Sequence, residues 1–322
     1  MQQIYPDYYP AFRCIAGACR HSCCIGWEID IDEDSAARYR AQAGDFGTRL
    51  RNCIDWSSEP PHFILGAEER CPFLNQDNLC DMILTLGEDA LCGICAQHPR
   101  FHNELPGRVE SGVGLCCEAA GALILGQAAP VRLLGADGAD TTDEIIAFRD
   151  ECIAIVQDRR YHIPKRVQNL LTRCGSGLPE RNMPEWAAFL LGLERLEERW
   201  AARLTALRET WDAVRLREFV LHMTERETEY EQFLVYLLYR HMANAPDLEE
   251  AALRGRFAAW GYYLLYALGA VQFSTDGDFT FAHQVELARL FSAELEYSEE
   301  NLDRILDELF ATSRCVNANS GW

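Results

Sequence analysis

EWAAFLLGLERLEERWAARLTALRETW, residues 185–211, is the stretch that decides the fold. Its apolar side chains recur at steps of three and four residues, the period at which one face of an α-helix repeats. This spacing predicts one long helix with a single apolar stripe, whose three tryptophans belong to the core. The stripe consists of Trp186, Phe189, Leu190, Leu193, Leu196, Trp200, Leu204, Leu207 and Trp211.

The chain that follows this stretch keeps the helical period. We expect further helices over 215–242 and 248–273, and a last helix after Ser298. The Ser298 side chain can cap the last helix, and Tyr297 can pack on Leu302 across its first turn. The pattern therefore predicts an all-α helical domain over residues 143–322. The buried face of its last helix should consist of Leu302, Ile305, Leu306, Leu309 and Phe310.

Residues 257–273, FAAWGYYLLYALGAVQF, form an uncharged stretch that raises the question of a membrane span. The stretch is rich in Ala, Gly and Tyr and is borderline short for crossing a bilayer. We therefore expect a buried core helix here and no membrane partner.

The first 125 residues have a different character, since prolines interrupt every longer run. Within them, GWEIDID (26–32) alternates apolar and polar residues and predicts a short half-buried strand, and DEDSAARYR (32–40) predicts a helix. Residues 126–142, rich in Gly, Ala, Pro and Asp, predict a linker or crossover. The predicted fold class is mainly α, with a loop-rich cysteine-cluster N-terminal region, residues 1–125, that has little strand and is packed on an all-α helical bundle.

The charge balance argues against one class of partner. The formal net charge is −20, from 50 acidic and 30 basic residues, and this excess repels phosphate backbones. We therefore expect no nucleic-acid partner. The opening residues, MQQIYPDYYPAFRC, lack the basic segment and apolar stretch of a secretory signal, so we expect a cytoplasmic protein.

Cysteines are concentrated at the front of the chain, where eleven of the fourteen precede residue 118. A disulfide framework is typical of small secreted proteins, and neither the length nor the opening residues fit that class. Reduced thiols in such number suggest metal ligands, because thiolates have the charge and softness that iron and zinc require. The eleven are Cys14, Cys19, Cys23, Cys24, Cys53, Cys71, Cys80, Cys92, Cys95, Cys116 and Cys117.

The spacing of these cysteines leaves several interpretations open. It matches no standard zinc-finger or ferredoxin pattern, although ligands need only converge in space. Cys92 and Cys95 form a Cys-x2-Cys pair that could act as a redox dithiol, but no thioredoxin-like context surrounds it. We expect Cys53, Cys152, Cys174 and Cys315 to be small buried hydrophobic residues. Arg100 and Glu118 could balance the charge of a thiolate-bound cluster or contact a zwitterionic cofactor.

Several segments together resemble the flagellin lysine-N-methylase family, whose members carry a cysteine-cluster region. They are CRHSCCIGWEIDID (19–32), CPFLNQDNLC (71–80), CAQHPR (95–100) and LCCEAA (115–120), with YEQFLVYLLYRH (230–241) and EYSEENLD (296–303) in the helical half. The likeness covers nearly the whole chain. It departs from the family at Cys117, where relatives tend to have proline, and at Cys92, which is additional.

The resemblance implies methyl transfer from S-adenosylmethionine to surface lysines of flagellin, in a protein that holds a four-iron, four-sulfur cluster, with zinc as the alternative metal. It implies that four cluster ligands are drawn from a larger set. Arg100 and Glu118 are candidates for contact with the cofactor. The candidate ligands are Cys14, Cys19, Cys23, Cys24, Cys71, Cys80, Cys95 and Cys116.

Two questions stay open at this level. No glycine-rich strand–turn–helix segment marks a nucleotide site, so the position of the methyl donor is not predicted. The cluster could be a structural knot or an iron site for the donor, and the absence of a Cys-x3-Cys-x2-Cys motif favours non-radical transfer. The competing interpretation is a non-enzymatic zinc or iron–sulfur protein that acts in redox chemistry or as a scaffold and shares the cysteine module.

Overall fold

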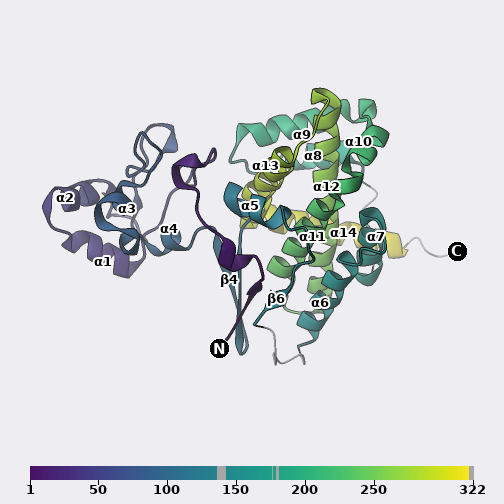
Figure 1. Cartoon of the computed structure of the whole chain (residues 1–322), viewed down its shortest axis with the longest axis horizontal. Coiled ribbons are helices and arrows are strands. Elements are labelled where there is room, and N and C mark those ends of the chain that lie inside the picture. The colour runs from purple at the N-terminus through teal and green to yellow at the C-terminus, as the bar shows by residue number, and fades with distance from the viewer. Residues whose placement is uncertain (136–142, 176, 179–180, 319–322) are drawn as a thin grey trace. The chain divides into compact units, whose positions relative to one another are not determined.

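The computed structural model describes residues 1–135, 143–175, 177–178 and 181–318, and the chain divides into two compact units (Figure 1). The helical unit comprises Met1–Phe12, His102–Cys116 and Ala120–Trp322, and the thiol unit comprises Arg13–Phe101 and Cys117–Ala119. The thiol unit is therefore an insertion in the sequence of the helical unit. The boundaries of the predicted domains, 1–125 and 143–322, differ from those of the two units, and the domains stay a prediction. Residues 136–142 of the predicted linker lie outside the described residues.

The helical unit consists of a small sheet and a large set of helices. Its strands are β1 (Gln2–Pro6), β4 (Arg100–Leu105), β5 (Arg108–Val113) and β6 (Leu133–Leu134), with the first two residues of β4 assigned to the thiol unit. Its helices are α5 (Glu118–Leu125, which begins in the thiol unit), α6 (Glu144–Val156), α7 (Ile163–Arg173), α8 (Met183–Leu190), α9 (Glu198–Thr210), α10 (Leu216–Met223), α11 (Glu227–Met242), α12 (Leu248–Asp276), α13 (Phe281–Phe291) and α14 (Glu299–Ala318). Short turns of 3-10 helix cover Tyr9–Ala11, Trp211–Ala213 and Thr224–Arg226, and a π-helix covers Ser292–Glu296.

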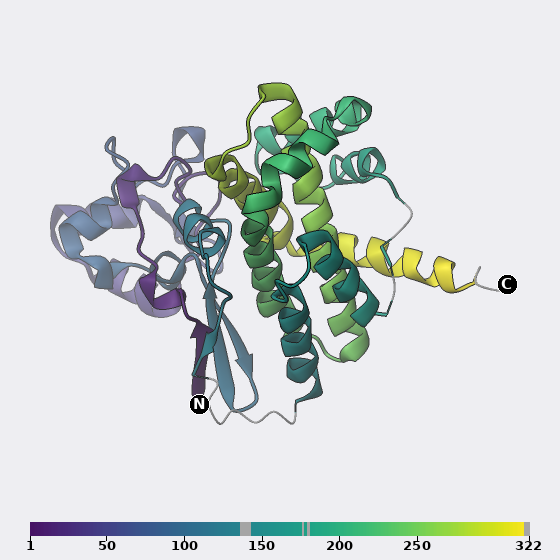
Figure 2. The same ribbon diagram turned by 45° about the vertical axis from the view of Figure 1, so that its right-hand side comes forward.

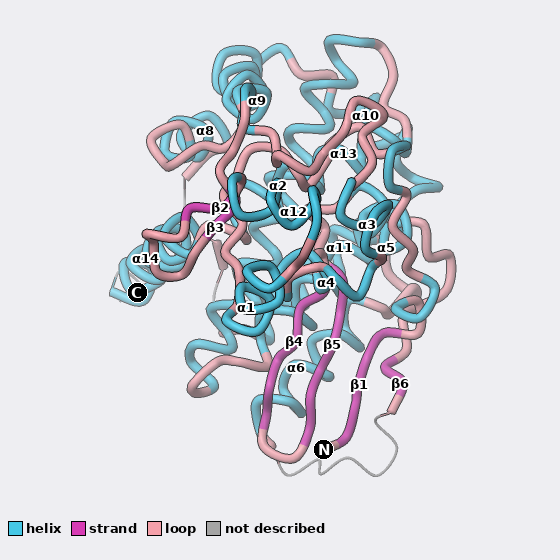
Figure 3. Tube along the Cα trace, turned by 90° about the vertical axis from the view of Figure 1, so that its left-hand side faces the viewer, coloured by secondary structure: helices cyan, strands magenta, loops and turns pink. Residues whose placement is uncertain are grey.

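The sheet has the strand order β4-β5-β1-β6 (Figure 3). β1 pairs with β5 in parallel, Gln2 opposite Arg108, and with β6 in antiparallel, Tyr5 opposite Leu134. Helix α11 holds two of these strands, because the Tyr239 hydroxyl lies 3.1 Å from the carbonyl oxygens of both Ile4 in β1 and Ser111 in β5. The small sheet thereby becomes part of the helical core.

Helix α12 is the central element of the helical unit (Figure 2). It contacts α6, α7, α9, α10, α11, α13 and α14. Apolar side chains lie on every side of this helix, and nearly all of them are buried. This is the pattern of a helix that is enclosed by other helices. The expected core helix at 257–273 is confirmed. In the described part of the chain, no helix has the length and apolar character required to cross a bilayer.

The prediction of one long helix over 185–211 is wrong. Residues 191–197 separate α8 from α9, and Leu196 of the predicted stripe is 53% exposed. The break arises because the buried Glu294 carboxylate accepts the backbone N–H groups of Leu196 and Glu197, at 2.9 and 2.6 Å, and so caps the start of α9. The three tryptophans differ in burial, because Trp186 and Trp200 are buried and Trp211 is half-buried.

The prediction of one helix over 215–242 is also corrected, because a 3-10 turn at Thr224–Arg226 divides α10 from α11. The Arg226 guanidinium there binds the carbonyl oxygen of Phe279 and the Glu229 carboxylate. The predicted helix over 248–273 is confirmed and runs three residues further, to Asp276, where Gly277 ends it at φ +79°.

The predicted last helix is confirmed as α14. The Ser298 hydroxyl accepts the backbone N–H of Asn301 at 3.3 Å, as expected of a cap. On its predicted buried face, Ile305, Leu306 and Leu309 are buried, and Leu302 and Phe310 are half-buried.

The thiol unit contains short elements joined by loops. Its helices are α1 (Glu33–Ala41), α2 (Gly44–Asn52), α3 (Asp81–Leu86) and α4 (Gly93–Gln97), with 3-10 turns at Ala16–Ala18, Ala67–Glu69 and Glu88–Ala90, and its strands are β2 (Ile54–Asp55) and β3 (His62–Phe63). The predicted helix at 32–40 is confirmed as α1, which the Asp32 side chain caps through the Ser35 N–H.

The expected strand at 26–32 is not formed, although its alternation of burial is correct. Ile29 and Ile31 are buried, but the segment makes one isolated bridge, between Asp30 and His62, and a second bridge lies just before it at Ile25. The facing chain contains Pro60 and Pro61, which have no N–H to donate, so a continuous ladder cannot form.

Candidate functional site

Six cysteines pack in or around the apolar core of the thiol unit, and the five whose thiols interact with one another are called the inner thiol group. They are Cys24, Cys71, Cys80, Cys92 and Cys95. Cys71 and Cys92 are buried among core residues that include Phe63 and Phe73, while the other three are half-buried at its edge. Cys53 also packs at this edge and is half-buried, so its expected full burial is not observed.

Short backbone elements hold the inner thiol group in place. The Cys71 N–H donates to the carbonyl oxygen of Cys24 at 2.8 Å, and Cys80 bridges to Leu74 across a tight turn. Cys92 is the N-cap residue of α4, and the Asp32 carboxylate accepts the Gly93 N–H at 2.8 Å. Residues far apart in the sequence therefore reach one small region.

Hydrogen bonds between thiols give the cysteines of this region different pKa values. A bond with Cys23 lowers the pKa of Cys24 to about 7, and a bond with Cys95 lowers the pKa of Cys92. The same bond to Cys92, followed by burial, raises the pKa of Cys95, whereas burial raises the pKa of Cys71 to about 12. Cys24 and Cys92 are consequently the first to supply thiolates, the form that binds metals.

A second set of thiols lies around Glu118 and is called the outer thiol group. It consists of Cys14, Cys19, Cys23 and Cys117. The Cys19 thiol donates to the His21 carbonyl oxygen at 3.2 Å and faces Glu118 Oε2 at 3.8 Å. Cys14 and Cys23 are exposed, so this group is nearer to solvent than the inner one.

Glu118 binds the loop that contains Arg20, between Cys19 and Cys23 of the outer thiol group. Its carboxylate accepts the backbone N–H of Arg20 at 3.0 Å and Arg20 Nε at 2.8 Å. Burial opposes ionisation of Glu118, but these bonds prevail and lower its pKa. Arg100, the other predicted cofactor residue, is half-buried at the start of β4.

The predicted ligand set is thus divided by the structure. Four of its members lie in the inner thiol group, Cys14, Cys19 and Cys23 lie in the outer one, and Cys116 belongs to the helical unit, where its thiol is hydrogen-bonded to Tyr297. Among the residues that the structure describes, no three His, Cys, Asp or Glu side chains are gathered in an arrangement that could hold a single metal ion. The eight-residue ligand set stays a prediction. Sequence reasoning left Cys92 and Cys117 out of it, and only their three-dimensional neighbours connect them to the two groups.

The other cysteines have simpler environments. Cys152 and Cys174 are buried in the helical unit, as expected, and their thiols are hydrogen-bonded to each other. The side chain of Cys315 lies outside the described part of the structure.

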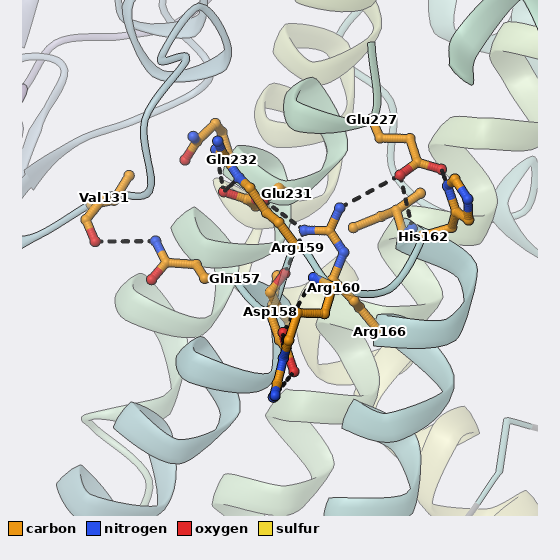
Figure 4. Close-up of polar contacts among 12 residues, drawn as sticks. Val131, Gln157, Asp158, Arg159, Arg160, His162, Arg166, Glu227, Glu231 and Gln232 are labelled. Atoms are coloured by element: carbon orange, nitrogen blue, oxygen red, sulfur yellow. Dashed lines mark hydrogen bonds and ion pairs between the residues drawn. The ribbon is translucent and has the colours of Figure 1, made fainter. Parts of the chain in front are cut away.

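The helical unit contains a buried carboxylate that sequence reasoning missed (Figure 4). Glu231 of α11 is completely buried and accepts Arg159 Nη2 at 2.8 Å and Arg166 Nη1 at 2.6 Å. On the same side of α11, Glu227 accepts the backbone N–H of Ile163 at 3.1 Å and lies 3.2 Å from His162 Nδ1. These contacts tie α11 to the connection between α6 and α7, so we assign Glu231 a structural role.

A second buried pair lies beside the π-helix. His241 Nε2 is 2.7 Å from Oε1 of Glu296, and Arg240 Nε is 3.5 Å from the same oxygen. Burial outweighs the attraction of Glu296 and lowers the pKa of His241. Single π-helical turns are rare in proteins overall, but those that occur are often found at functional sites. The sequence signal was a polar pair at the end of an apolar helix.

The tyrosines of α11 are core residues. Burial raises the pKa of Tyr230 and Tyr236 well above the ordinary value. The Tyr236 hydroxyl accepts the backbone N–H of Leu115 at 3.2 Å. These groups are therefore poor candidates for a base that acts on a substrate.

A family model and several relatives place this chain among known proteins. The model of the FliB lysine N-methylase C-terminal domain matches residues 180–318. The Lysine-N-methylase of Salmonella typhimurium (strain LT2) is 32% identical over 121 residues, which cover 35% of this chain and 29% of that protein. The Flagellar biosynthetic protein FliU of Salmonella muenchen is 31% identical over 121 residues, which cover 35% of this chain and 70% of that protein. No solved structure gives a significant match.

A helical unit that carries an inserted thiol-rich unit is the class of protein that the fold and its cysteines define. Within that class, the chain belongs to the FliB lysine N-methylase family. The match spans 29% of the length of the lysine-N-methylases of Salmonella typhimurium (strain LT2) and Salmonella choleraesuis (strain SC-B67).

Proposed function

We propose that this protein is a protein-lysine N-methyltransferase that transfers methyl groups from S-adenosylmethionine to surface lysines of flagellin. The observation that carries the proposal is the match of residues 180–318 to the lysine N-methylase domain. The name of the FliU relative, a flagellar biosynthetic protein, supports flagellin as the substrate. The many reduced thiols support a cytoplasmic location, where cysteines stay unpaired.

We further propose that the inner thiol group holds a four-iron, four-sulfur cluster through four of its five cysteines. Its chemistry fits, because it offers enough soft sulfur ligands for one cluster in an apolar surrounding that limits solvent access. When bound, such a cluster supplies a rigid connection between loops that have little core of their own. The outer thiol group is the alternative site, but two of its four members are exposed.

The chemistry requires a neutral substrate amine. A lysine side chain is protonated at neutral pH, so methyl transfer needs its proton removed by desolvation or by a nearby base. Tyr230 and Tyr236 do not suit this role, because burial raises their pKa well above the ordinary value. We therefore assign the base to neither of these tyrosines.

The test is methyl transfer by the purified protein. Anaerobically prepared protein is incubated with flagellin and S-adenosylmethionine labelled in its methyl group, and transferred label is measured on flagellin and mapped to lysines by mass spectrometry. We expect label on surface lysines, and none on a flagellin whose surface lysines have been replaced by arginine. Absence of label with a cluster-loaded preparation would overturn the enzyme proposal.

Metal analysis separates the proposed cofactor from its alternative. Iron and acid-labile sulfide in equal amounts, with a brown colour, support the cluster. A colourless protein that contains zinc and no labile sulfide would instead support a non-enzymatic zinc scaffold.

A further inference from the structure

A pocket of about 480 Å³ opens on the surface of the thiol unit. It is lined by Glu68, Arg70, Leu74, Asn75, Gln76 and Asn78. Its volume falls in the range of small-molecule sites, roughly 300–1,000 Å³. Its lining is mostly polar and contains one cation and one anion.

The two charges of this pocket are not neutralised by the protein. Arg70 Nη2 donates to the carbonyl oxygen of Asn75 at 3.3 Å and to Oδ1 of Asn78 at 3.2 Å, both of which are neutral acceptors. Within the described ranges, no carboxylate lies at ion-pair distance from Arg70 and no cation lies at that distance from Glu68. A ligand with a carboxylate and an ammonium group would complement both charges.

The backbone around the pocket is held in an unusual conformation. Glu68, Glu69 and Asn78 have φ of 57°, 54° and 56°, in the left-handed region that side chains other than glycine seldom adopt. Such residues persist where the surrounding structure fixes them, and they cluster at ligand sites. Here Asn75 fixes the turn, since its Oδ1 accepts the N–H groups of both Asp77 and Leu79 at 3.0 Å.

The pocket adjoins the inner thiol group. Leu74 of its lining packs against the apolar core that contains those thiols and bridges to Cys80. Arg70 directly precedes Cys71, and its charge acts on the Cys24 thiol. A molecule bound in the pocket would therefore lie beside the site that we assign to the cluster.

We propose that this pocket binds the amino-acid end of S-adenosylmethionine, with Arg70 receiving its carboxylate and Glu68 its ammonium group. This inference rests on the proposed function, which supplies the identity of the ligand. It assigns the methyl donor to the thiol unit, whereas the family match at 180–318 lies in the helical unit. It also explains how a donor site exists without a glycine-rich nucleotide motif, because charge recognition of the amino-acid end does not need one.

The experiment measures binding of S-adenosylhomocysteine, the stable product of the donor, by calorimetry on the metal-loaded full-length protein. We expect Arg70→Gln to weaken binding by about tenfold or more and Glu68→Gln by about threefold or more, since each removes one charge-assisted contact. Glu69→Gln and Arg217→Gln are matched controls, because neither residue lines the pocket. Both controls should bind within about twofold of the wild type.

Methylthioadenosine, which lacks the amino-acid end, supplies a second measurement. Its affinity should be the same for the wild type and Arg70→Gln, so the preference for S-adenosylhomocysteine over methylthioadenosine should be about tenfold smaller in Arg70→Gln than in the wild type. Iron content and circular dichroism verify that each variant is folded and loaded, and the exposed Glu68 tests the site with little risk to folding.

The outcomes separate the two proposals. If the wild type neither binds S-adenosylhomocysteine nor transfers methyl groups, the proposed function and this inference both fail. If it binds, and folded Arg70→Gln and Glu68→Gln bind equally well, the donor site lies elsewhere and only this inference is overturned.

Discussion

Arg20 Nε and Glu118 Oε1 lie 2.8 Å apart, although 97 residues separate them in the chain, and Glu118 accepts the backbone N–H of Arg20 as well. The pair joins the two segments that supply the outer thiol group. Its Arg20 side chain is 58% exposed, so the ionic contribution is small, and the bond to the backbone N–H is the more important constraint.

We predict that Glu118→Ala releases the loop around Arg20 without unfolding the protein. The amide of Arg20 should exchange with solvent at least about tenfold faster, because its acceptor is gone, while the free energy of unfolding falls by only about 1 kcal/mol. Hydrogen exchange with mass spectrometry measures the first quantity. Unchanged exchange at residues 19–21 would contradict the role of Glu118.

We predict that single Cys→Ser changes divide the thiols into two classes by their effect on iron content. Replacement at four of the five inner positions, Cys24, Cys71, Cys80, Cys92 and Cys95, should remove most of the iron, because serine is a poor ligand for iron–sulfur clusters. Replacement of the outer Cys14 should leave most of it, and Cys53→Ser and Cys152→Ser are controls. Iron and sulfide assays on anaerobically purified protein supply the measurement, and equal loss at Cys14 and Cys71 would contradict the assignment to the inner thiol group.

Glu231→Gln should destabilise the helical unit strongly. The change keeps the shape of the side chain but removes the closer of the two carboxylates that pair with the buried Arg166, since Glu227 stays at 3.6 Å, and we expect the free energy of unfolding to fall by about 3 kcal/mol. Urea unfolding followed by circular dichroism measures the loss. The matched control is Glu151→Gln, whose ion pair with Arg173 is exposed and should contribute less than about 0.5 kcal/mol. Similar losses in the two variants would show that the burial of Glu231 has no energetic consequence.

Gly114→Ala should be destabilising for a steric reason. A Cβ atom at this position would overlap the Tyr297 hydroxyl and approach Arg240 Nη1 to 3.1 Å, so we expect a loss of about 2 kcal/mol. Adding Tyr297→Phe removes the obstructing oxygen and should recover part of that stability. Gly177→Ala, which has open space around it, is the control. Thermal unfolding of the single and double variants gives the comparison, and a double variant less stable than Gly114→Ala would refute the explanation.

His98 should make the thiol unit sensitive to acid. Burial lowers its pKa from 6.5 to about 4, and its ring packs on Trp27. The unfolded chain therefore binds a proton more readily than the folded one between these values, and stability falls as the pH drops from about 6.5 to about 4. After discounting for partial solvent exposure, we expect a loss of about 1–2 kcal/mol.

The measurement for His98 is unfolding at pH 7.5 and pH 5, compared with His98→Gln. The variant has no titrating ring, so its stability should change less between the two pH values. An equal change in both proteins would mean that other groups cause the acid sensitivity.

Local sequence signals identified some helices correctly and missed others for a physical reason. Helices α12 and α14 were predicted because their signals are contained within them, namely an extended apolar run and the Ser298 cap. The breaks at 191–197 and 224–226 depend on distant partners, Glu294 and Phe279. A periodic apolar pattern continues through both breaks, so no local rule reveals them.

The sequence predicted which kind of residue forms the candidate site, but it did not predict how these residues are arranged in space. The concentration of cysteines before residue 118 indicated a thiol-rich region, and the structure gathers six of them at one core. Cys23 and Cys24 are neighbours in sequence and their thiols are hydrogen-bonded to each other, yet Cys23 is exposed and Cys24 packs at the apolar core. Which of two adjacent thiols reaches the core depends on the backbone turn at that point, which composition does not determine.

The order of the strands has a consequence for synthesis of the protein. Gln2 in β1 pairs with Arg108 in β5, so roughly one hundred residues must leave the ribosome before the first strand finds its partner. During that interval the thiol-rich insertion has already been made, while the edge of β1 is still unpaired. An unpaired strand edge can pair with other chains, so the long insertion prolongs the period in which the nascent chain can aggregate.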